Sequence, residues 1–136
     1  MSRIVLDCSI TMAWCFKDEA NPAADSALAG LNENDAVVPS IWPLEVANVL
    51  VLSERKGRIT AEASARFIEM LAALPIFIDE QTTQKALKEV LALARVWQTT
   101  SYDAAYLELA MRVGAPLATL DARLKAAAAR LGIPVL

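Results

Sequence analysis

Four acidic residues, Asp7, Glu45, Asp103 and Asp121, stand where a metal-dependent reaction would need them. Each is expected at the end of a strand or in the first turn of a helix. The chain of 136 residues contains no histidine, which removes Ser-His and Cys-His nucleophile pairs, imidazole bases and His-rich zinc sites. Carboxylates that hold a hard divalent cation are therefore the natural candidates for any chemistry.

Taken singly, each acid also has a structural interpretation. Asp7 follows a short apolar run, where it could hold a cation or cap the next helix. Glu45 lies one turn into a helix, with Asn48 three residues further along the same face, which is more typical of a site edge than of a solvated face. Asp103 and Asp121 lie at helix starts, where carboxylates commonly stabilise the helix. The four together are more specific than any one of them.

Short apolar runs alternate with helix-favouring segments along the whole chain. Strands are expected at 4–6, 36–38, 76–78 and 116–119, with a fifth, short one at 134–136. Helices are expected at about 9–16, 22–31, 43–56, 61–74, 83–94, 101–113 and 122–132. Their expected N-terminal caps include Ser9, Asn21, Thr60, Ser101 and Asp121. Residues 95–100 could be either loop or helix. This alternation predicts a single domain over residues 1–136, a three-layer α/β/α sandwich around a mainly parallel sheet of four to five short strands.

The acids are expected to converge at one end of this sheet. Ligands of open α/β sheets collect outside the carboxyl ends of the strands, and Asp7 and Asp121 follow the first and fourth strands. Clustered carboxylates raise one another's pKa unless a cation neutralises them, and Mg²⁺ or Mn²⁺ prefers such oxygen ligands. Ser9 and Thr119 supply nearby hydroxyls that could hold a ligand or a metal-bound water, or could serve as helix caps.

Composition limits the class of protein. The formal net charge of −3 and the pI near 4.9 argue against a general nucleic-acid binder. Arg55, Lys56 and Arg58 nevertheless gather at one predicted helix end, either as a basic rim that guides a substrate or as cations that stabilise the helix C-terminus. An apolar content of 56% predicts that part of the surface is buried against a partner, in an oligomer or a permanent hetero-complex.

The expected location is the cytoplasm. No apolar run approaches the roughly 20 residues of a membrane span, and no signal-peptide core opens the sequence. Cys8 and Cys15 are too few for a disulfide framework. On one helix they would lie about two turns apart, so both are expected to be reduced thiols.

Four segments carry a resemblance to a known family: VLDCS at residues 5–9, PLEVANVL at 43–50, SYDAAYL at 101–107 and LATLD at 117–121. In this order the chain resembles the PIN-domain ribonucleases, and within them the VapC toxins of bacterial type II toxin–antitoxin systems. The resemblance extends over nearly the whole chain. It implies a PIN-like fold and a Mg²⁺-dependent endoribonuclease, with Mn²⁺ able to replace Mg²⁺, that cleaves RNA phosphodiester bonds by metal-activated water.

The resemblance also implies roles for individual residues. The four acids correspond to the acidic pocket of the family, with Asp7 and Asp103 at the positions most directly assigned to Mg²⁺. The supporting polar positions are Ser9, Asn48 and Thr119. Candidates for substrate binding are Arg55, Lys56 and Arg58.

Implied partners follow from the same resemblance. Family members commonly form homodimers and bind a cognate VapB-type antitoxin, whose C-terminal segment wraps the toxin and blocks its pocket. The expectation is thus a homodimer within a larger toxin–antitoxin complex that binds RNA as substrate, contacts operator DNA only through the antitoxin, and has no membrane association.

Three other classes of protein are alternatives. A receiver domain would show adjacent acids after its first strand and a Lys after its last, and this chain shows neither. A haloacid-dehalogenase-like phosphatase would need a second Asp two residues after Asp7, where this chain has Ser9. A catalytically inactive PIN-like domain that only binds protein or RNA stays open, although the four intact acids argue against it.

Overall fold

The computed structural model describes residues 2–136, and its strands form one parallel sheet. The spatial order is β3-β2-β1-β4, with bounds β1 (Arg3–Leu6), β2 (Asp35–Pro39), β3 (Ile76–Asp79) and β4 (Leu117–Ala118). The predicted α/β sandwich with a parallel central sheet is confirmed. The expected fifth strand is reduced to a single bridge between Leu117 and Val135.

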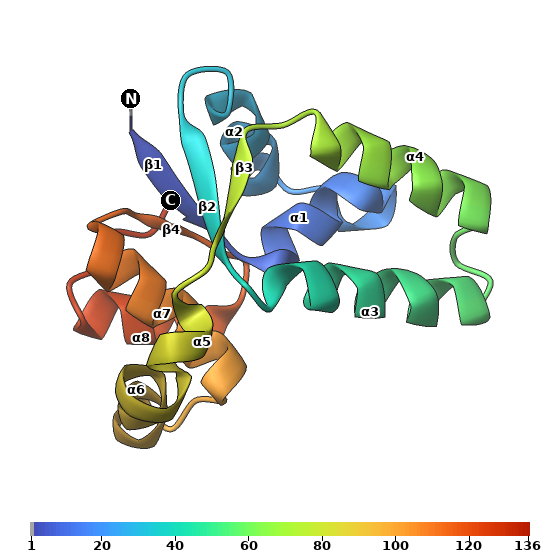
Figure 1. Cartoon of the computed structure of the whole chain (residues 1–136). Coiled ribbons are helices and arrows are strands. Elements are labelled where there is room, and N and C mark those ends of the chain that lie inside the picture. The colour runs from blue at the N-terminus through green and yellow to red at the C-terminus, as the bar shows by residue number, and fades with distance from the viewer. Residues whose placement is uncertain (1) are drawn as a thin grey trace.

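Helices cover both faces of the sheet (Figure 1). One side carries α1 (Cys8–Cys15), the short 3₁₀ turn η1 (Lys17–Glu19), α2 (Pro22–Gly30), α3 (Trp42–Arg55) and α4 (Ala61–Ala72). The other carries α5 (Thr82–Lys85), the π-helical turn η2 (Ala86–Val90), α6 (Leu91–Trp97), α7 (Ser101–Val113) and α8 (Ala122–Arg130). Helices α3 and α4 form a hairpin that projects beyond the sheet (Figure 1).

Most helix boundaries follow the expected caps. The side chains of Asn21, Thr60 and Asp121 each accept a hydrogen bond from a backbone N–H in the first turn of their helix. Gly57 and Gly114 follow α3 and α7 with φ values of 72° and 65°, a conformation that favours glycine.

Two expected caps were wrong. Thr100, not Ser101, caps α7, because the Thr100 hydroxyl accepts from the Asp103 N–H at 3.1 Å. Asp7 occupies the N-cap position of α1, and Ser9 lies inside the first turn of that helix. The Ser9 hydroxyl donates to the Asp7 carboxylate instead of accepting from the helix backbone.

The segment that the sequence left open is mostly helical. Helix α6 continues to Trp97 and ends at Gln98, which has a left-handed backbone with φ 52°. The π-helical turn η2 joins α5 and α6, so helical structure runs from Thr82 to Trp97. None of the helices among the described residues has the length and apolar character to cross a membrane.

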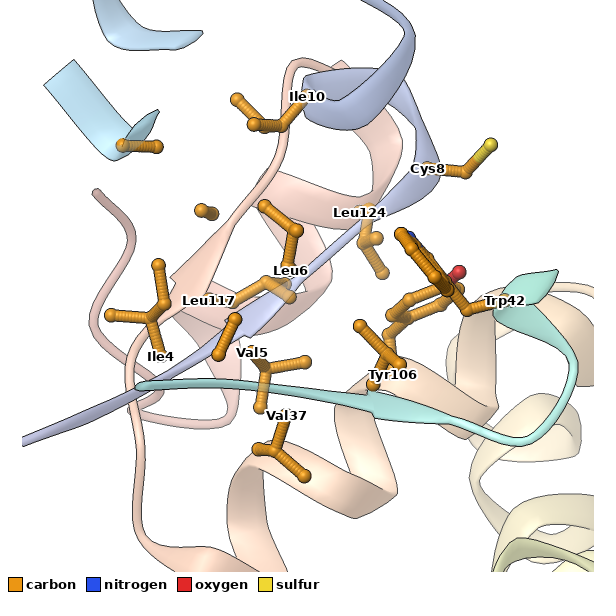
Figure 2. Packing of buried hydrophobic residues seen from close by; sticks show 14 of the residues in the cluster. Ile4, Val5, Leu6, Cys8, Ile10, Val37, Trp42, Tyr106, Leu117 and Leu124 are labelled. Atoms are coloured by element: carbon orange, nitrogen blue, oxygen red, sulfur yellow. The ribbon is translucent and has the colours of Figure 1, made fainter. Parts of the chain in front are cut away.

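The core lies around β1, the strand that carries Asp7. Val5 and Leu6 are completely buried, as are Leu117 of β4 and Tyr106 of α7. Figure 2 shows these side chains packed together with Leu124 of α8. Burying an aliphatic side chain of this size contributes about 1.5–3 kcal/mol. Asp7 therefore directly follows a strand whose last three residues are buried.

The topology makes the carboxyl ends of β1 and β4 a switch point. After β1 the chain passes to the side of α1–α4, and after β4 it passes to α8 on the other side (Figure 1). The helices that follow the two strands leave in opposite directions, and ligands of open α/β sheets bind outside the carboxyl ends of such strands.

Candidate active site

Asp7 lies at this switch point and is 6% exposed. Its backbone N–H donates to the Ala118 carbonyl at 3.0 Å, which joins the ends of β1 and β4. Its Oδ2 atom accepts two hydroxyl hydrogen bonds, from Thr119 at 2.6 Å and from Ser9 at 2.8 Å. No side chain among residues 2–136 donates to Oδ1, so one oxygen is fixed and the other is left for a ligand.

The hydroxyls of Ser9 and Thr119 also hold the loop after β4. Ser9 Oγ accepts from the Leu120 N–H at 2.9 Å, and Thr119 Oγ1 accepts from the Asp121 N–H at 3.0 Å. Each hydroxyl thus accepts from a backbone N–H of this loop and donates to Asp7. We call this set of four hydrogen bonds the hydroxyl bridge. It holds Asp121 beside Asp7 although 114 positions separate them in the chain.

Glu45 reaches the site from α3, which lies on the side of the sheet opposite α7 and α8 (Figure 1). It lies in the first turn of α3 and its Oε1 accepts a short hydrogen bond from the Tyr106 hydroxyl. Tyr106 is completely buried in α7, one turn after Asp103. The phenol therefore anchors Glu45 of one helical layer to the opposite layer and restricts the carboxylate to one orientation.

Asp103 and Asp121 complete the cluster from helix starts. Asp103 is half-buried in the first turn of α7, and its backbone N–H is held by Thr100. Asp121 is more exposed, and its Oδ1 caps α8 by accepting from the Leu124 N–H at 2.9 Å. Both retain the helix-start role considered from the sequence, and both also face the cluster.

Charge repulsion shows that the acids lie together. Burial raises the pKa of Asp7, and the nearby Asp121 charge raises it further against the opposing hydroxyl hydrogen bonds. Burial also raises the pKa of Glu45, with smaller contributions from Asp7 and Asp103. The pKa of Asp103 is raised by burial and then by Asp121 and Asp7, and Arg123 partly offsets this.

No Lys or Arg among residues 2–136 forms an ion pair with these four carboxylates. A concentration of negative charge without a paired cation is electrostatically costly, and a bound metal ion is one way to relieve it. Within the same residues, however, no three carboxylate or thiol groups converge closely enough to hold one metal ion as the side chains lie. Metal binding therefore requires side-chain rotation in at least part of the cluster.

Cys8 lies between the acids but does not join their chemistry. Burial, together with the charges of Glu45 and Asp7, raises the pKa of its thiol to about 12. The group stays a neutral thiol near pH 7, and neither a metal ligand nor a nucleophile is expected from it. Both Cys8 and Cys15 are free and lie on α1, as the sequence predicted.

The remaining candidates lie further away. Asn48 is exposed on α3, one turn beyond Glu45, and makes no side-chain hydrogen bond among the described residues. Arg55 and Lys56 lie at the far end of α3, about 15 Å along the helix from Glu45. Arg58 is held there by Asp18 at 2.8 Å and Glu19 at 2.7 Å.

Tyr106 and Arg123 were not predicted as site residues from the sequence. Tyr106 stands three residues after Asp103, a spacing that places both side chains on one face of a helix, and this signal was available. The proximity of Arg123 to Asp103 could not be predicted from the sequence, because it depends on the packing of α8 beside α7.

These features define a parallel α/β sandwich with a cluster of acidic residues at its switch point. The family model of the PIN domain matches residues 4–130. This chain belongs to the PIN-domain family. Ribonuclease VapC3 of Pyrobaculum aerophilum is 30% identical over 122 residues, which cover 90% of this chain and 92% of that protein.

Solved structures share the fold. PAE2754 from Pyrobaculum aerophilum superposes with a TM-score of 0.69 at 20% identity and covers 93% of this chain and 84% of its own. VapBC2 from Rickettsia felis, solved with a DNA fragment from its promoter, gives a TM-score of 0.69 at 14% identity and covers 98% of this chain and 97% of the matched chain.

Proposed function

We propose that this protein is a divalent-metal-dependent endoribonuclease and the toxin of a type II toxin–antitoxin pair. The observation that carries the proposal is the group of four carboxylates at the switch point, without a paired Lys or Arg among residues 2–136. The likeness to Ribonuclease VapC3 supports RNA as the substrate.

The donor set fits Mg²⁺ or Mn²⁺ by its chemistry. All candidate ligands are carboxylate oxygens, which such hard cations prefer. Asp7 and Asp103 are proposed as the main ligands, with Glu45 and Asp121 completing the set. A bound ion would supply an activated water and would stabilise negative charge on the phosphodiester.

The protein's own residues prepare this site before a ligand arrives. Ser9 and Thr119 restrict the Asp7 carboxylate, and Tyr106 restricts Glu45. Such preorganisation limits the reorientation needed on binding. The exposed side chain of Asn48, one turn beyond Glu45 on α3, would contact substrate. The basic group of Arg55, Lys56 and Arg58 would contact only RNA that extends along α3.

The test is an RNase assay on partner-free protein with added Mg²⁺ or Mn²⁺ and with EDTA. Asp7→Asn and Asp103→Asn should lose cleavage, whereas Arg66→Gln, an exposed charge change on α4, should keep it. Cleavage that survives EDTA, or equal activity of wild type and both Asn variants, would reject the metal-dependent mechanism.

A second candidate function is a PIN-like module that binds without cleaving. The observation that favours it is the absence, within residues 2–136, of three groups converged on one metal position. The same assay separates the two functions. Binding of the metal with no cleavage of ribosomal, transfer or messenger RNA would favour the binding module.

An antitoxin partner is supported by the surface as well as by the relatives. An apolar groove of about 340 Å³ lies between α3, α4 and the edge strand β3, and its walls include Leu50, Ile68 and Ile78. Ile68 and Ile78 are 52% and 50% exposed. The VapBC2 structure is bound to a DNA fragment from its promoter. This supports a VapB-type antitoxin here, with operator DNA bound only through that antitoxin.

Further exposed apolar side chains, among them Leu44, Leu87 and Val96, support a homodimer within a larger complex. We infer that the protein acts in the cytoplasm, where RNA is accessible. Expression of the chain alone should halt growth, and co-expression of an adjacent small gene should restore it. Normal growth with soluble, cleavage-competent protein would argue against the toxin role.

A further inference from the structure

A second hollow lies directly beside the acidic cluster. It has a volume of about 640 Å³ and runs between α8 and the turn that joins α6 to α7. Asp103 lines one part of it, and Arg123, Arg130 and Trp97 line the rest together with Gln98, Thr99 and Thr100. The groove is therefore continuous with the candidate active site through Asp103, and we call it the α8 groove.

The charge of the α8 groove is opposite to that of the acidic cluster. Arg123 and Arg130 are exposed, and neither forms an ion pair with an acid among residues 2–136. Asp103 is the one acid in the lining, and the Arg123 charge already acts on it. In contrast, Arg58 and Arg112 are bound to neighbouring acids. The groove thus presents free guanidinium groups to a ligand.

The spacing of the two arginines suits a polyanion more than a single anion. They stand seven residues apart on α8, which is about two turns, or roughly 10 Å along the helix. Both therefore lie on one face but can contact different phosphates of one strand. Guanidinium groups bind phosphate oxygens in a bidentate manner.

Trp97 adds a surface for a base. The indole lines the same groove at the end of α6 and is partly exposed. Aromatic stacking with cationic backbone contacts is the usual combination in proteins that bind single-stranded nucleic acid, because every base has a π-face. A duplex would keep its bases stacked on each other and would not use the indole.

We propose that a single strand of RNA lies in the α8 groove, with its phosphates on Arg123 and Arg130 and a base on Trp97. This inference rests on the proposed ribonuclease function for the identity of the strand. The groove would deliver the strand to the acidic cluster past Asp103. It also explains how a chain of net charge −3 holds a polyanion, because the binding charge is local.

The experiment measures binding apart from cleavage. A fluorescent single-stranded RNA oligonucleotide is titrated with full-length Asp7→Asn protein in EDTA, and anisotropy is recorded at several salt concentrations. In this background, Arg123→Gln/Arg130→Gln should weaken binding by about tenfold and lower the salt-dependence slope by about 1.4, or about 0.7 for each lost phosphate contact. Trp97→Ala should weaken binding by about fivefold or more, and Trp97→Phe should restore most of it.

Lys125→Gln is the matched control. It removes the same charge from the same helix, but Lys125 is exposed outside the groove, two residues from Arg123 and hence on another face. Equal weakening by Lys125→Gln, or no weakening by the double arginine variant, would overturn the groove assignment. Competition by a poly-glutamate peptide as strong as by RNA, with no effect of Trp97→Ala, would identify an acidic protein as ligand and reject RNA.

The outcomes separate this inference from the proposed function. If wild type cleaves RNA with metal but the double arginine variant binds normally, only the groove assignment fails. If the arginines and Trp97 control binding but no metal-dependent cleavage occurs, the groove is confirmed as an RNA surface and the ribonuclease proposal fails.

Discussion

Asp7 and Asp79 both end a parallel strand of the same sheet, yet their surroundings are opposite. Asp79 ends the edge strand β3 and accepts two hydrogen bonds from Arg112 of α7, at 2.8 Å and 3.0 Å. Arg112 also binds Glu108 at 2.8 Å. Asp7 directly follows the central strand β1, lies among other acids and accepts hydrogen bonds from the Ser9 and Thr119 hydroxyls. The Asp79 cluster contains its own paired cation, whereas no Lys or Arg among residues 2–136 forms an ion pair with the Asp7 cluster.

The pKa values of the two aspartates shift in opposite directions. Hydrogen bonds from Arg112 hold the pKa of Asp79 below its usual value. Burial raises the pKa of Asp7 above its usual value, and no Lys or Arg among residues 2–136 forms an ion pair with it. An acid at a strand end is structural when an arginine neutralises it. It becomes a candidate for chemistry when the fold leaves its charge uncompensated.

The largest expected effect compares two glutamates, one in each cluster. Glu45→Gln should lower metal-dependent RNA cleavage by about 100-fold, the upper range for groups that support a metal site. Glu108→Gln should leave the rate of the folded protein near that of wild type. Initial cleavage rates, normalised to folded protein, are the measurement. Similar losses in both variants would remove the distinction between the clusters.

The next effect is the stabilisation of the folded protein by a bound metal ion. Mg²⁺ or Mn²⁺ at 100 times its dissociation constant should stabilise wild type by about 2.7 kcal/mol. Asp79→Asn should show the same gain, because its cluster already holds Arg112, whereas Asp7→Asn should lose most of it. Thermal unfolding with and without metal tests this. A metal-induced gain of equal size in Asp7→Asn would place the ion elsewhere.

The stability of the metal-free protein should respond to the two aspartates with opposite sign. Asp79→Asn should lower the free energy of unfolding by about 1–3 kcal/mol, since it breaks charge-assisted hydrogen bonds. Asp7→Asn should not lower it and is expected to raise it, because a buried charge is removed. Urea unfolding at pH 7 measures both changes. A larger loss for Asp7→Asn than for Asp79→Asn would contradict the comparison.

The pH dependence follows from the same signs. The pKa of Asp79 in the folded protein is lower than in the unfolded chain. Asp79 therefore stabilises the fold above pH 3.8, its ordinary value, and this stabilisation is lost as the pH falls through the folded pKa. The pKa of Asp7 in the folded protein is higher than in the unfolded chain. Its contribution to the free energy of unfolding is therefore present below pH 3.8 and is lost as the pH rises through the folded pKa. In a plot of the free energy of unfolding against pH, Asp79→Asn should remove the change that Asp79 causes and leave the change from Asp7 as it is. Asp7→Asn should do the reverse.

The smallest expected effect is that of Tyr106→Phe. It removes the hydroxyl that holds Glu45 but keeps the buried ring. Cleavage should fall by about tenfold, the lower range for a group that orients a metal ligand, while the free energy of unfolding should change by about 1 kcal/mol or less. A variant with unchanged cleavage would show that Glu45 does not need this anchor.

Much of the site was predictable because local sequence patterns determine strand ends and helix starts. The apolar run before Asp7 predicted β1, and Asp121 was correctly expected after a later strand, whereas Thr119 was expected inside that strand and follows it. The predicted caps failed at Ser101, where the Thr100 hydroxyl caps the helix, and at Ser9, whose hydroxyl donates to Asp7. Backbone propensity alone could not show that the nearby Asp7 carboxylate would take the Ser9 hydroxyl as its donor.

The alternation of strands and helices, the four acids and the absence of histidine could all be read from the sequence. Which acids keep an uncompensated charge depends on the packing of the folded chain. Asp7 and Asp79 look alike in sequence, each following a short apolar run. Arg112 reaches Asp79 because α7 packs across the sheet. The same packing places Tyr106 on Glu45, and charge compensation over such sequence distances is a property of the fold alone.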